Sequence, residues 1–284
     1  MRFAFAGFDR GIGVFDMFVQ SGWEPVALFT IPVDNKVDFH DVTAERAEHY
    51  QLPLKLSRIR DDDLRMLQAM QCDALIVSGY AWKIPDWTRS LPYAINFHPS
   101  PLPEGRGPYP QIQALLEPRL EWAATCHRIA AEFDTGDVLD TERFPLSHDE
   151  SHEMLELKLQ MAMHRLASRV AIDFHRLWDE RSPQSPGSYW PRASDAQRTL
   201  DFNQPVADVM RVVRACGLLE CFAPLRTTQV SVRRAEGWVE AHTYQPGDIV
   251  HEYRRRIVIA AQDGFIALIE WSPLPLMVRA QMGP

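Results

Sequence analysis

FAFAGFDRGIGVFDMFVQSGWEPVALFT, residues 3–30, alternates apolar runs with an amphipathic segment, and we expect this alternation to set the fold of the first domain. Phe3 to Ala6 is a short apolar run that stops at Gly7, as a buried strand does. An amphipathic segment at 14–21 follows, and a second apolar run covers 25–30. A strand, a helix and a second strand in this order predict a parallel β-α-β unit.

The alternation of apolar strands and amphipathic helices continues beyond this unit. Residues 43–50 predict a helix, and three consecutive acidic residues at 61–63 suit the start of another, where the helix dipole favours negative charge. Apolar runs at 74–77 and 94–98 predict the strands that follow. Strands that alternate with helices predict an α/β fold with an open, mostly parallel, Rossmann-like sheet.

The composition of the chain changes near residue 182. Two more strands and a long helix are expected before it, whereas residues 182–188 hold two prolines, one glycine and three serines, which is typical of a linker. After one further helix, short strand-like runs are separated by turn signals and predict a β-rich, partly open barrel. These runs are 228–233, 238–243, 248–251, 256–261 and 265–271. We therefore predict a first domain at 1–182, a linker at 183–199 and a smaller, OB-like domain at 200–284.

The chain has 284 residues, a formal net charge of -8 and four cysteines. The acidic balance disfavours a polyanionic partner, because phosphate backbones are bound by basic surfaces. The cysteines lack the paired spacing of a zinc site, so reduced, buried thiols are expected. No run reaches the ~20 apolar residues of a membrane span, and the first strand begins too early for a signal peptide. We therefore expect a cytoplasmic protein without a membrane partner.

Polar side chains gather where the strand at 94–98 ends. Within INFHPSPLPEGRG, residues 95–107, Asn96 and His98 are two residues apart on a strand, so both side chains leave the same face. The strand stops at Pro99, and open α/β sheets bind ligands at the carboxyl ends of their strands. The loop that follows is rich in proline and glycine and suits the rigid wall of a pocket.

A second polar group surrounds a glycine turn at the end of another predicted strand. Asp134 and Asp137 flank Gly136, and one carboxylate could reach His98 if the two strands are neighbours. An amide, an imidazole and a carboxylate suit acyl transfer to an amine. The amide and the imidazole stabilise the oxyanion, and the imidazole passes a proton to the leaving nitrogen. The carboxylate orients the ring and helps to deprotonate the attacking amine.

These motifs resemble those of the formyltransferases that use 10-formyltetrahydrofolate. That family carries an Asn-x-His-x-Ser-x-Leu-Pro-x-x-Arg-Gly stretch followed by an Asp-x-Gly turn. The matching positions here are Asn96, His98, Ser100, Leu102, Pro103, Arg106 and Gly107, then Asp134 and Gly136. More loosely, residues 189–215 resemble the start of the C-terminal domain of the tRNA and aminoarabinose-type members.

The resemblance implies a Rossmann-like catalytic domain, an open-barrel domain and 10-formyltetrahydrofolate as co-substrate. It implies a catalytic trio of Asn96, His98 and Asp134. The pterin pocket that it implies is lined by Trp82, Lys83, Ile84 and Phe133. The substrate loop that it implies contains Ser100, Leu102 and Arg106. No metal is expected, because a formyl group on an arylamine-like nitrogen is already activated.

Two other kinds of site fit the sequence poorly. Gly7, Gly11 and Gly13 do not have the GxGxxG spacing of a nicotinamide site. His148 and His152 are four residues apart, but the glutamate that follows the first histidine in a zinc motif is replaced by aspartate. We therefore expect a solvated helix start there.

The acceptor of the formyl group is left open by the sequence. Pro101, the segment 108–110 and the short turn 8–10 depart from the family pattern, and these departures bear on the acceptor rather than the donor. We expect a small-molecule amine, such as an amino-sugar nucleotide, because the chain is acidic. Methionyl-tRNA formyltransferase, a 10-formyltetrahydrofolate hydrolase and a non-catalytic folate-binding module are the alternatives. A homodimer is also considered.

Overall fold

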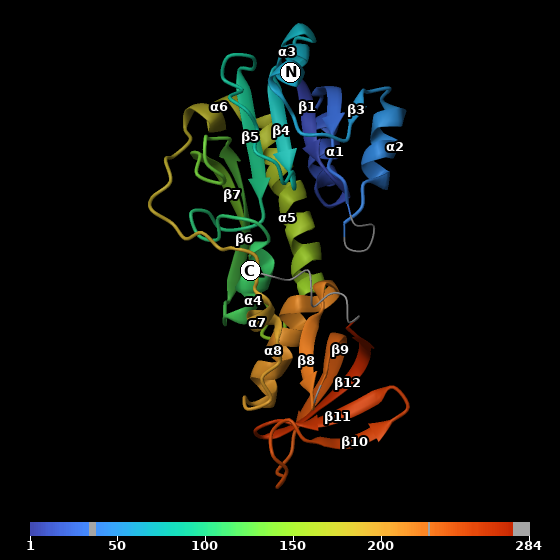
Figure 1. The fold of residues 1–284 in the computed structure, drawn as a ribbon. Coiled ribbons are helices and arrows are strands. Elements are labelled where there is room, and N and C mark those ends of the chain that lie inside the picture. Colours follow the sequence, from blue (N-terminus) through green and yellow to red (C-terminus); the bar gives the residue numbers. More distant parts are fainter. Residues whose placement is uncertain (34–37, 227, 275–284) are drawn as a thin grey trace. The chain divides into compact units, whose positions relative to one another are not determined.

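The computed structural model describes residues 1–33, 38–226 and 228–274 (Figure 1). Their contacts divide the chain into two compact units. Unit 1 comprises Met1–Pro110, Glu121–Leu146 and Glu156–Arg192, and unit 2 comprises Gln111–Leu120, Ser147–Leu155 and the chain from Ala193 onward. None of the described helices combines the length and the apolar character that a membrane crossing requires.

Unit 1 is built on a seven-stranded sheet with the order β3-β2-β1-β4-β5-β6-β7. Its strands are β1 (Arg2–Gly7), β2 (Glu24–Phe29), β3 (Leu54–Lys55), β4 (Ala74–Ser78), β5 (Tyr93–His98), β6 (Glu121–Arg128) and β7 (Val138–Pro145). The first five pair in parallel, whereas β6 and β7 add an antiparallel edge. The predicted Rossmann-like, mostly parallel sheet is therefore confirmed.

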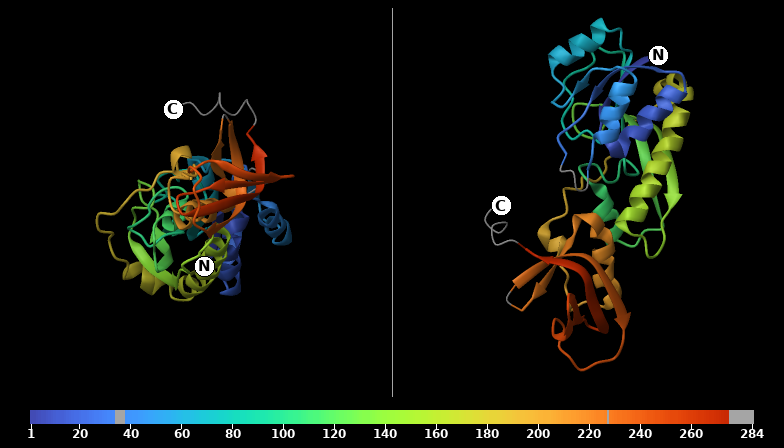
Figure 2. Two further views of the ribbon diagram at one scale, coloured as in Figure 1. Left: turned by 90° about the horizontal axis from the view of Figure 1, so that it is seen from below. Right: turned by 90° about the vertical axis from the view of Figure 1, so that its right-hand side faces the viewer.

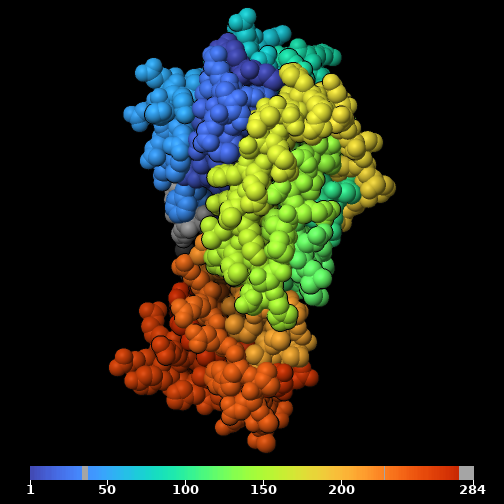
Figure 3. Space-filling view, turned by 180° about the vertical axis from the view of Figure 1, so that it is seen from behind, coloured from blue at the N-terminus to red at the C-terminus, as the bar shows by residue number. Residues whose placement is uncertain are grey.

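Helices cover the sheet of unit 1. They are α1 (Ile12–Gln20), α2 (Asp41–His49), α3 (Asp61–Ala69), the part of α5 (His152–Ile172) from Glu156, and α6 (Phe174–Asp179). Seen from behind, α5 lies beside the blue N-terminal segment (Figure 3). Gly13 permits this approach, because a Cβ there would come within 1.6 Å of the His164 ring.

The sequence predicts an apolar stripe on one long helix, formed by Leu155, Leu159, Leu166, Val170 and Leu177. The stripe is buried, but α5 ends at Ile172 and Leu177 lies on α6, so the expected helix is two helices. Leu155, Leu159, Leu166 and Val170 are fully or almost fully inaccessible to solvent. Strand β1 is apolar on both faces for the same reason, since the sheet is covered on both sides. The carboxyl ends of β1, β4 and β5 therefore sit on a rigid core.

Unit 2 contains a five-stranded antiparallel sheet with the order β10-β11-β12-β9-β8. Its strands are β8 (Cys221–Leu225), β9 (Thr228–Val239), β10 (Ile249–Tyr253), β11 (Arg256–Ala260) and β12 (Gly264–Pro273). Its helices are α4 (Pro110–Leu116), α7 (Asp195–Arg198) and α8 (Val206–Cys216), and α8 packs its apolar face on the sheet (Figure 2). The C-terminal β-rich domain is confirmed, and its OB-like closure stays a prediction.

Two details of the C-terminal sheet differ from the sequence-based expectation. The runs expected as separate strands at 228–233 and 238–243 join into one long β9, because 234–237 keep pairing with β12. Strand β8, which contains Pro224, was not among the expected strands. Pro224 is tolerated because β8 is the last strand in the order of this sheet, with β9 as its neighbouring strand.

The segment predicted as a linker begins inside unit 1. Residues 183–192 belong to that unit, and two isolated bridges flank and enter the segment, Val138 to Ser182 and Arg106 to Tyr189. Proline- and serine-rich composition therefore does not mark a free linker here, because the backbone hydrogen bonds of this segment go to neighbouring loops. We propose a domain boundary near residue 192.

Candidate active site

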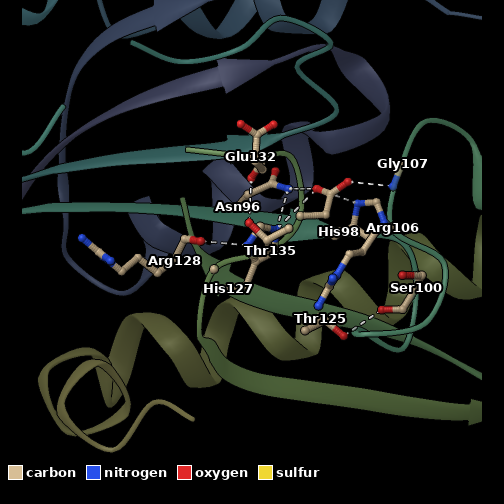
Figure 4. A network of polar contacts seen from close by, with 12 residues as sticks. Asn96, His98, Ser100, Arg106, Gly107, Thr125, His127, Arg128, Glu132 and Thr135 are labelled. Carbon is tan, nitrogen blue, oxygen red and sulfur yellow. Dashed lines mark hydrogen bonds and ion pairs between the residues drawn. The ribbon is translucent and has the colours of Figure 1, made fainter. Parts of the chain in front are cut away.

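Asn96 sits near the end of β5, directly opposite His127 of β6 (Figure 4). The Asn96 Nδ2 atom lies 3.0 Å from His127 Nε2 and 3.5 Å from Asp134 Oδ1. His127 Nδ1 lies 2.8 Å from the main-chain oxygen of Arg128, which can only accept, so Nδ1 carries the proton of a neutral ring. Nε2 is then the acceptor, and the Asn96 amide must turn its nitrogen toward it.

His98 ends β5, and its ring is held between a carbonyl and a carboxylate. Nε2 lies 2.9 Å from the Gly105 oxygen and Nδ1 lies 3.3 Å from Asp134 Oδ1. Because a carbonyl only accepts, the Nε2–H donates to Gly105 and a neutral ring keeps its lone pair on Nδ1. Burial lowers the pKa of His98, while the Asp134 charge opposes that shift. His98 therefore faces Asp134 with the nitrogen that can accept a proton.

Asp134 supplies the carboxylate at the centre of the cluster. Burial disfavours its charge, but the positive charges that His98 and His127 carry when protonated, a hydrogen bond from the His127 ring and the Gly107 N–H together lower the pKa of Asp134 to about 2. The Gly107 N–H donates to Oδ2 at 2.9 Å, which leaves Oδ1 to face Asn96 and both histidines. The residue is 9% exposed and has φ +58, in the left-handed region. The carboxylate is therefore ionised at neutral pH and fixed from several sides.

The structure thus brings the three predicted catalytic residues together. Asn96 is half-buried while His98 and Asp134 are buried, so the amide is the part of the trio that a substrate can meet first. One Asn96 N–H is used by His127, and the other, 3.5 Å from Asp134, is weakly bonded and available to a carbonyl oxygen. Asp137, the alternative carboxylate, instead pairs with Arg181 at 3.3 Å.

The residues predicted to line the pterin pocket come from two loops that meet. Lys83 Nζ lies 3.5 Å from Glu132 Oε1, which joins the loop after β4 to the turn before Asp134. Trp82 and Ile84 are half-buried against the core, whereas the Phe133 ring is 48% exposed. Apolar surface left exposed on a loop beside polar groups suits the flat, partly apolar ring of a pterin.

The predicted substrate-loop residues are buried or hydrogen-bonded within the protein. Ser100 is fully buried and donates to the Glu104 oxygen at 2.8 Å, and Leu102 is 8% exposed. Arg106 donates to Gln184 Oε1 through Nε at 3.0 Å and Nη2 at 2.7 Å. These residues shape the loop after β5, and we propose that they position it instead of contacting the acceptor.

The two short segments that depart from the family pattern meet in the structure. Arg10 of the first turn donates to the Tyr109 hydroxyl at 2.9 Å and lies over its ring. The same guanidinium pairs with Asp38 at 2.6 Å and with Glu156 at 3.1 Å. The departures at 8–10 and 108–110 are therefore one structural feature, next in the chain to Gly107.

Two residues of this site were missed by the sequence analysis, His127 and Gln184. His127 is separated by 31 positions from Asn96, and only the antiparallel β5–β6 register makes them partners. A histidine on an otherwise apolar strand, Trp122 to Cys126, was the available signal. Gln184 lies in a stretch whose composition indicates a linker, so no signal pointed to it.

Two models of one protein family match most of the chain. The model of the formyl transferase family matches residues 34–171, and that of the formyl transferase C-terminal domain matches residues 192–274. The chain belongs to the formyl transferase family. Among its relatives, a methionyl-tRNA formyltransferase of Coprothermobacter proteolyticus is 28% identical over 173 residues, 60% of this chain and 57% of the relative.

Solved structures share the fold of this formyl transferase family member. HypX from Aquifex aeolicus in complex with tetrahydrofolic acid superposes with a TM-score of 0.69 at 18% identity, covering 97% of this chain and 44% of HypX. An N-formyltransferase from Helicobacter canadensis, in complex with folinic acid and dTDP-3-aminofucose, gives 0.68 at 16% identity, covering 95% and 99%. The chain thus spans less than half of HypX and 57% of the Coprothermobacter relative.

Proposed function

We propose that this formyl transferase family member moves a formyl group from 10-formyltetrahydrofolate to the amine of a small-molecule acceptor. The observation that carries the proposal is the placement of Asp134 Oδ1 3.3 Å from His98 Nδ1 and 3.5 Å from Asn96 Nδ2 at the tip of β5. An amide, a basic nitrogen and an ionised carboxylate there can serve each step of acyl transfer to nitrogen.

In the proposed reaction the acceptor nitrogen attacks the formyl carbon, and negative charge develops on the formyl oxygen. The weakly bonded N–H of Asn96 stabilises that oxygen. The proton lost by the amine is taken up between His98 Nδ1 and Asp134 Oδ1, which lie 3.3 Å apart and can each accept it. When the bond between the formyl carbon and N10 breaks, the same proton passes to N10, so the site returns to its starting state.

The choice of donor is supported by the two exposed loops that carry Trp82 and Phe133 and by the bound molecules of the structural neighbours. HypX was solved with tetrahydrofolic acid and the Helicobacter canadensis enzyme with folinic acid. We propose that Trp82, Lys83, Ile84 and Phe133 hold the pterin. The cytoplasmic location and a homodimer remain predictions.

The proposed acceptor class is an amino sugar on a nucleotide. The acidic net charge of -8 favours a small acceptor over tRNA, and the fold is shared with an enzyme solved with dTDP-3-aminofucose. Methionyl-tRNA formyltransferase is the second candidate, because curated relatives carry that name. A 10-formyltetrahydrofolate hydrolase, with water as acceptor, is the third.

The test is a formyl-transfer assay with 10-formyltetrahydrofolate and a panel of amino-sugar nucleotides, charged initiator tRNA, and no acceptor. We expect tetrahydrofolate release that depends on an amino sugar, with Asn96→Ala, His98→Ala and Asp134→Asn each lower in kcat by on the order of 10²-fold or more. Formylated tRNA alone would favour the second candidate, formate release without an amine the third, and no turnover at all would contradict the proposal.

A further inference from the structure

The segment 183–190 is bonded to the loop after β5 along its length. The Arg106 N–H donates to the Ser188 oxygen at 3.0 Å, and the Trp190 N–H donates to the Arg106 oxygen at 2.7 Å. Trp190 also stacks on the buried ring of Trp122, with centroids 5.7 Å apart. This segment is therefore part of the wall of the site, although it is mostly exposed.

Gln184 is half-buried in this segment and uses its whole carboxamide. Its Oε1 accepts two hydrogen bonds from the Arg106 guanidinium, at 3.0 and 2.7 Å. Its Nε2 donates to the main-chain oxygens of Asp134, at 2.9 Å, and Gly136, at 2.6 Å. Arg106 has only donors and the carbonyls only accept, so the orientation of the amide is fixed by its partners.

The contacts of Gln184 converge on the residue that carries the proposed proton acceptor. Asp134 is held by its side chain through the Gly107 N–H and by its main chain through Gln184. Arg106 and Gly107 are adjacent in the loop after β5. Gly107 binds the Asp134 side chain directly, and Arg106 is connected to the Asp134 main chain through Gln184. Asp134 has left-handed backbone geometry, which an L-residue keeps only when its surroundings fix it.

We propose that Gln184 is a positioning residue for formyl transfer, which holds the 134–136 turn against Arg106 and thereby sets where the Asp134 carboxylate lies. This inference rests on the proposed function for its effect on turnover. A glutamine fits because the position needs two acceptor contacts on one side and two donor contacts on the other.

The variant that tests this is Gln184→Glu, which keeps the shape and the Arg106 contact but turns two donors into acceptors facing carbonyl oxygens. We expect kcat to fall on the order of 10- to 100-fold through misplacement of the carboxylate, with little change in the KM for 10-formyltetrahydrofolate. Gln68→Glu, which adds the same charge at an exposed position of α3, is the matched control and should match the wild type.

Two readouts separate positioning from a general loss of structure. In an Asp134→Asn background, Gln184→Glu should lower kcat little further, because its effect acts through that carboxylate. In ¹⁵N-histidine-labelled protein, the His98 signals, assigned by their loss in His98→Gln, should shift in Gln184→Glu and stay in place in Gln68→Glu. Gln184→Met replaces Gln184→Glu in both experiments if the latter does not fold.

Unchanged His98 signals, or a wild-type kcat in the variant, would overturn the role of Gln184. An equal loss of kcat with and without Asp134 would do the same, since the effect would not pass through the carboxylate. If the wild type formylates no amine, the proposed function fails instead, and the His98 spectra still decide whether Gln184 places Asp134.

Discussion

At the scale of single residues, main-chain carbonyls fix which ring nitrogen of His127 and of His98 carries the proton. The Arg128 carbonyl fixes the proton of His127 on Nδ1, which makes Nε2 an acceptor, which in turn orients the amide of Asn96. On the other side, the Gly105 carbonyl fixes the His98 tautomer and leaves Nδ1 to Asp134. The positions of these two carbonyls thus determine that Asn96 Nδ2 donates a hydrogen bond to His127 and that His98 Nδ1 is left as an acceptor.

His127→Phe tests the role of the His127 ring. The substitution keeps a ring in the buried position but removes the acceptor of the Asn96 N–H, so the amide is free to rotate. We expect kcat to fall on the order of 10-fold, and the free energy of unfolding to fall by about 1–3 kcal/mol, because the Asn96 N–H and the Arg128 carbonyl both lose their partner. Steady-state kinetics and urea unfolding measure both, and a wild-type kcat would contradict the role given to His127.

The lowered pKa of His98 gives a prediction for stability against pH. The folded state binds this proton less readily than the unfolded chain, whose histidine titrates near 6.5, so His98 stabilises the fold above that pH and loses this effect below it. His98→Gln should therefore flatten the decline of the free energy of unfolding on acidification from pH 7.5 to 5.5. Urea titrations at several pH values check this, and parallel curves for the two proteins would refute it.

At the scale of elements, the β5–β6 pairing and the 183–190 segment build the site around the tip of one parallel strand. The antiparallel register places His127 opposite Asn96 and Thr125 opposite His98. The Thr125 hydroxyl donates to the Ser100 oxygen at 2.7 Å, so β6 also holds the start of the loop after β5. An antiparallel neighbour thereby holds both Asn96 and the start of that loop.

Gly187→Ala tests the contribution of the 183–190 segment. A Cβ at this position would come 2.0 Å from the Pro103 carbonyl oxygen, so the segment must move away from the loop after β5. We expect kcat to fall on the order of 10-fold or more, by displacement of the groups that the segment holds.

Gly22→Ala is the control for this substitution. That position has φ +85 and nothing within 4 Å of an added Cβ, so it adds backbone strain of about 1 kcal/mol without touching the site. Its kcat should equal the wild-type value. If both variants lose kcat to the same extent, the effect comes from stability and not from the segment.

The sequence predicted the parallel strands from local patterns, and the resemblance to a family motif singled out Asn96, His98 and Asp134. Asn96 and His98 are two residues apart on one strand, and short apolar runs predicted the buried strands, two of which end next to a glycine, Gly7 and Gly79. The partners of the trio depend on pairings that no local pattern carries. His127 joins the site through an antiparallel register, and Gln184 through hydrogen bonds to loops about 50 and 80 residues earlier.

At the scale of the whole molecule, charge bears on the choice of acceptor. The chain carries 38 acidic and 30 basic residues, which gives the net charge of -8. Binding to tRNA relies on basic side chains that neutralise phosphates, and its strength falls steeply with salt. A small acceptor needs no such surface.

We therefore expect no measurable binding of initiator tRNA at physiological ionic strength, and only weak, salt-sensitive binding at low salt. Fluorescence anisotropy with labelled tRNA, titrated at several salt concentrations, tests this. Competition by tRNA in the amino-sugar assay is the functional counterpart. Tight binding that persists at physiological salt would favour tRNA as the acceptor.

The left-handed backbone of Asp134 restricts which side chains can occupy the centre of the site. Aspartate and asparagine tolerate this geometry, whereas a longer glutamate does so poorly and would also overreach the Gly107 N–H. Asparagine at this position therefore removes the negative charge with the least disturbance of the turn. Glutamate keeps the charge but moves the carboxylate and strains the backbone. Of the two carboxylate residues, the main-chain geometry at this position therefore favours aspartate.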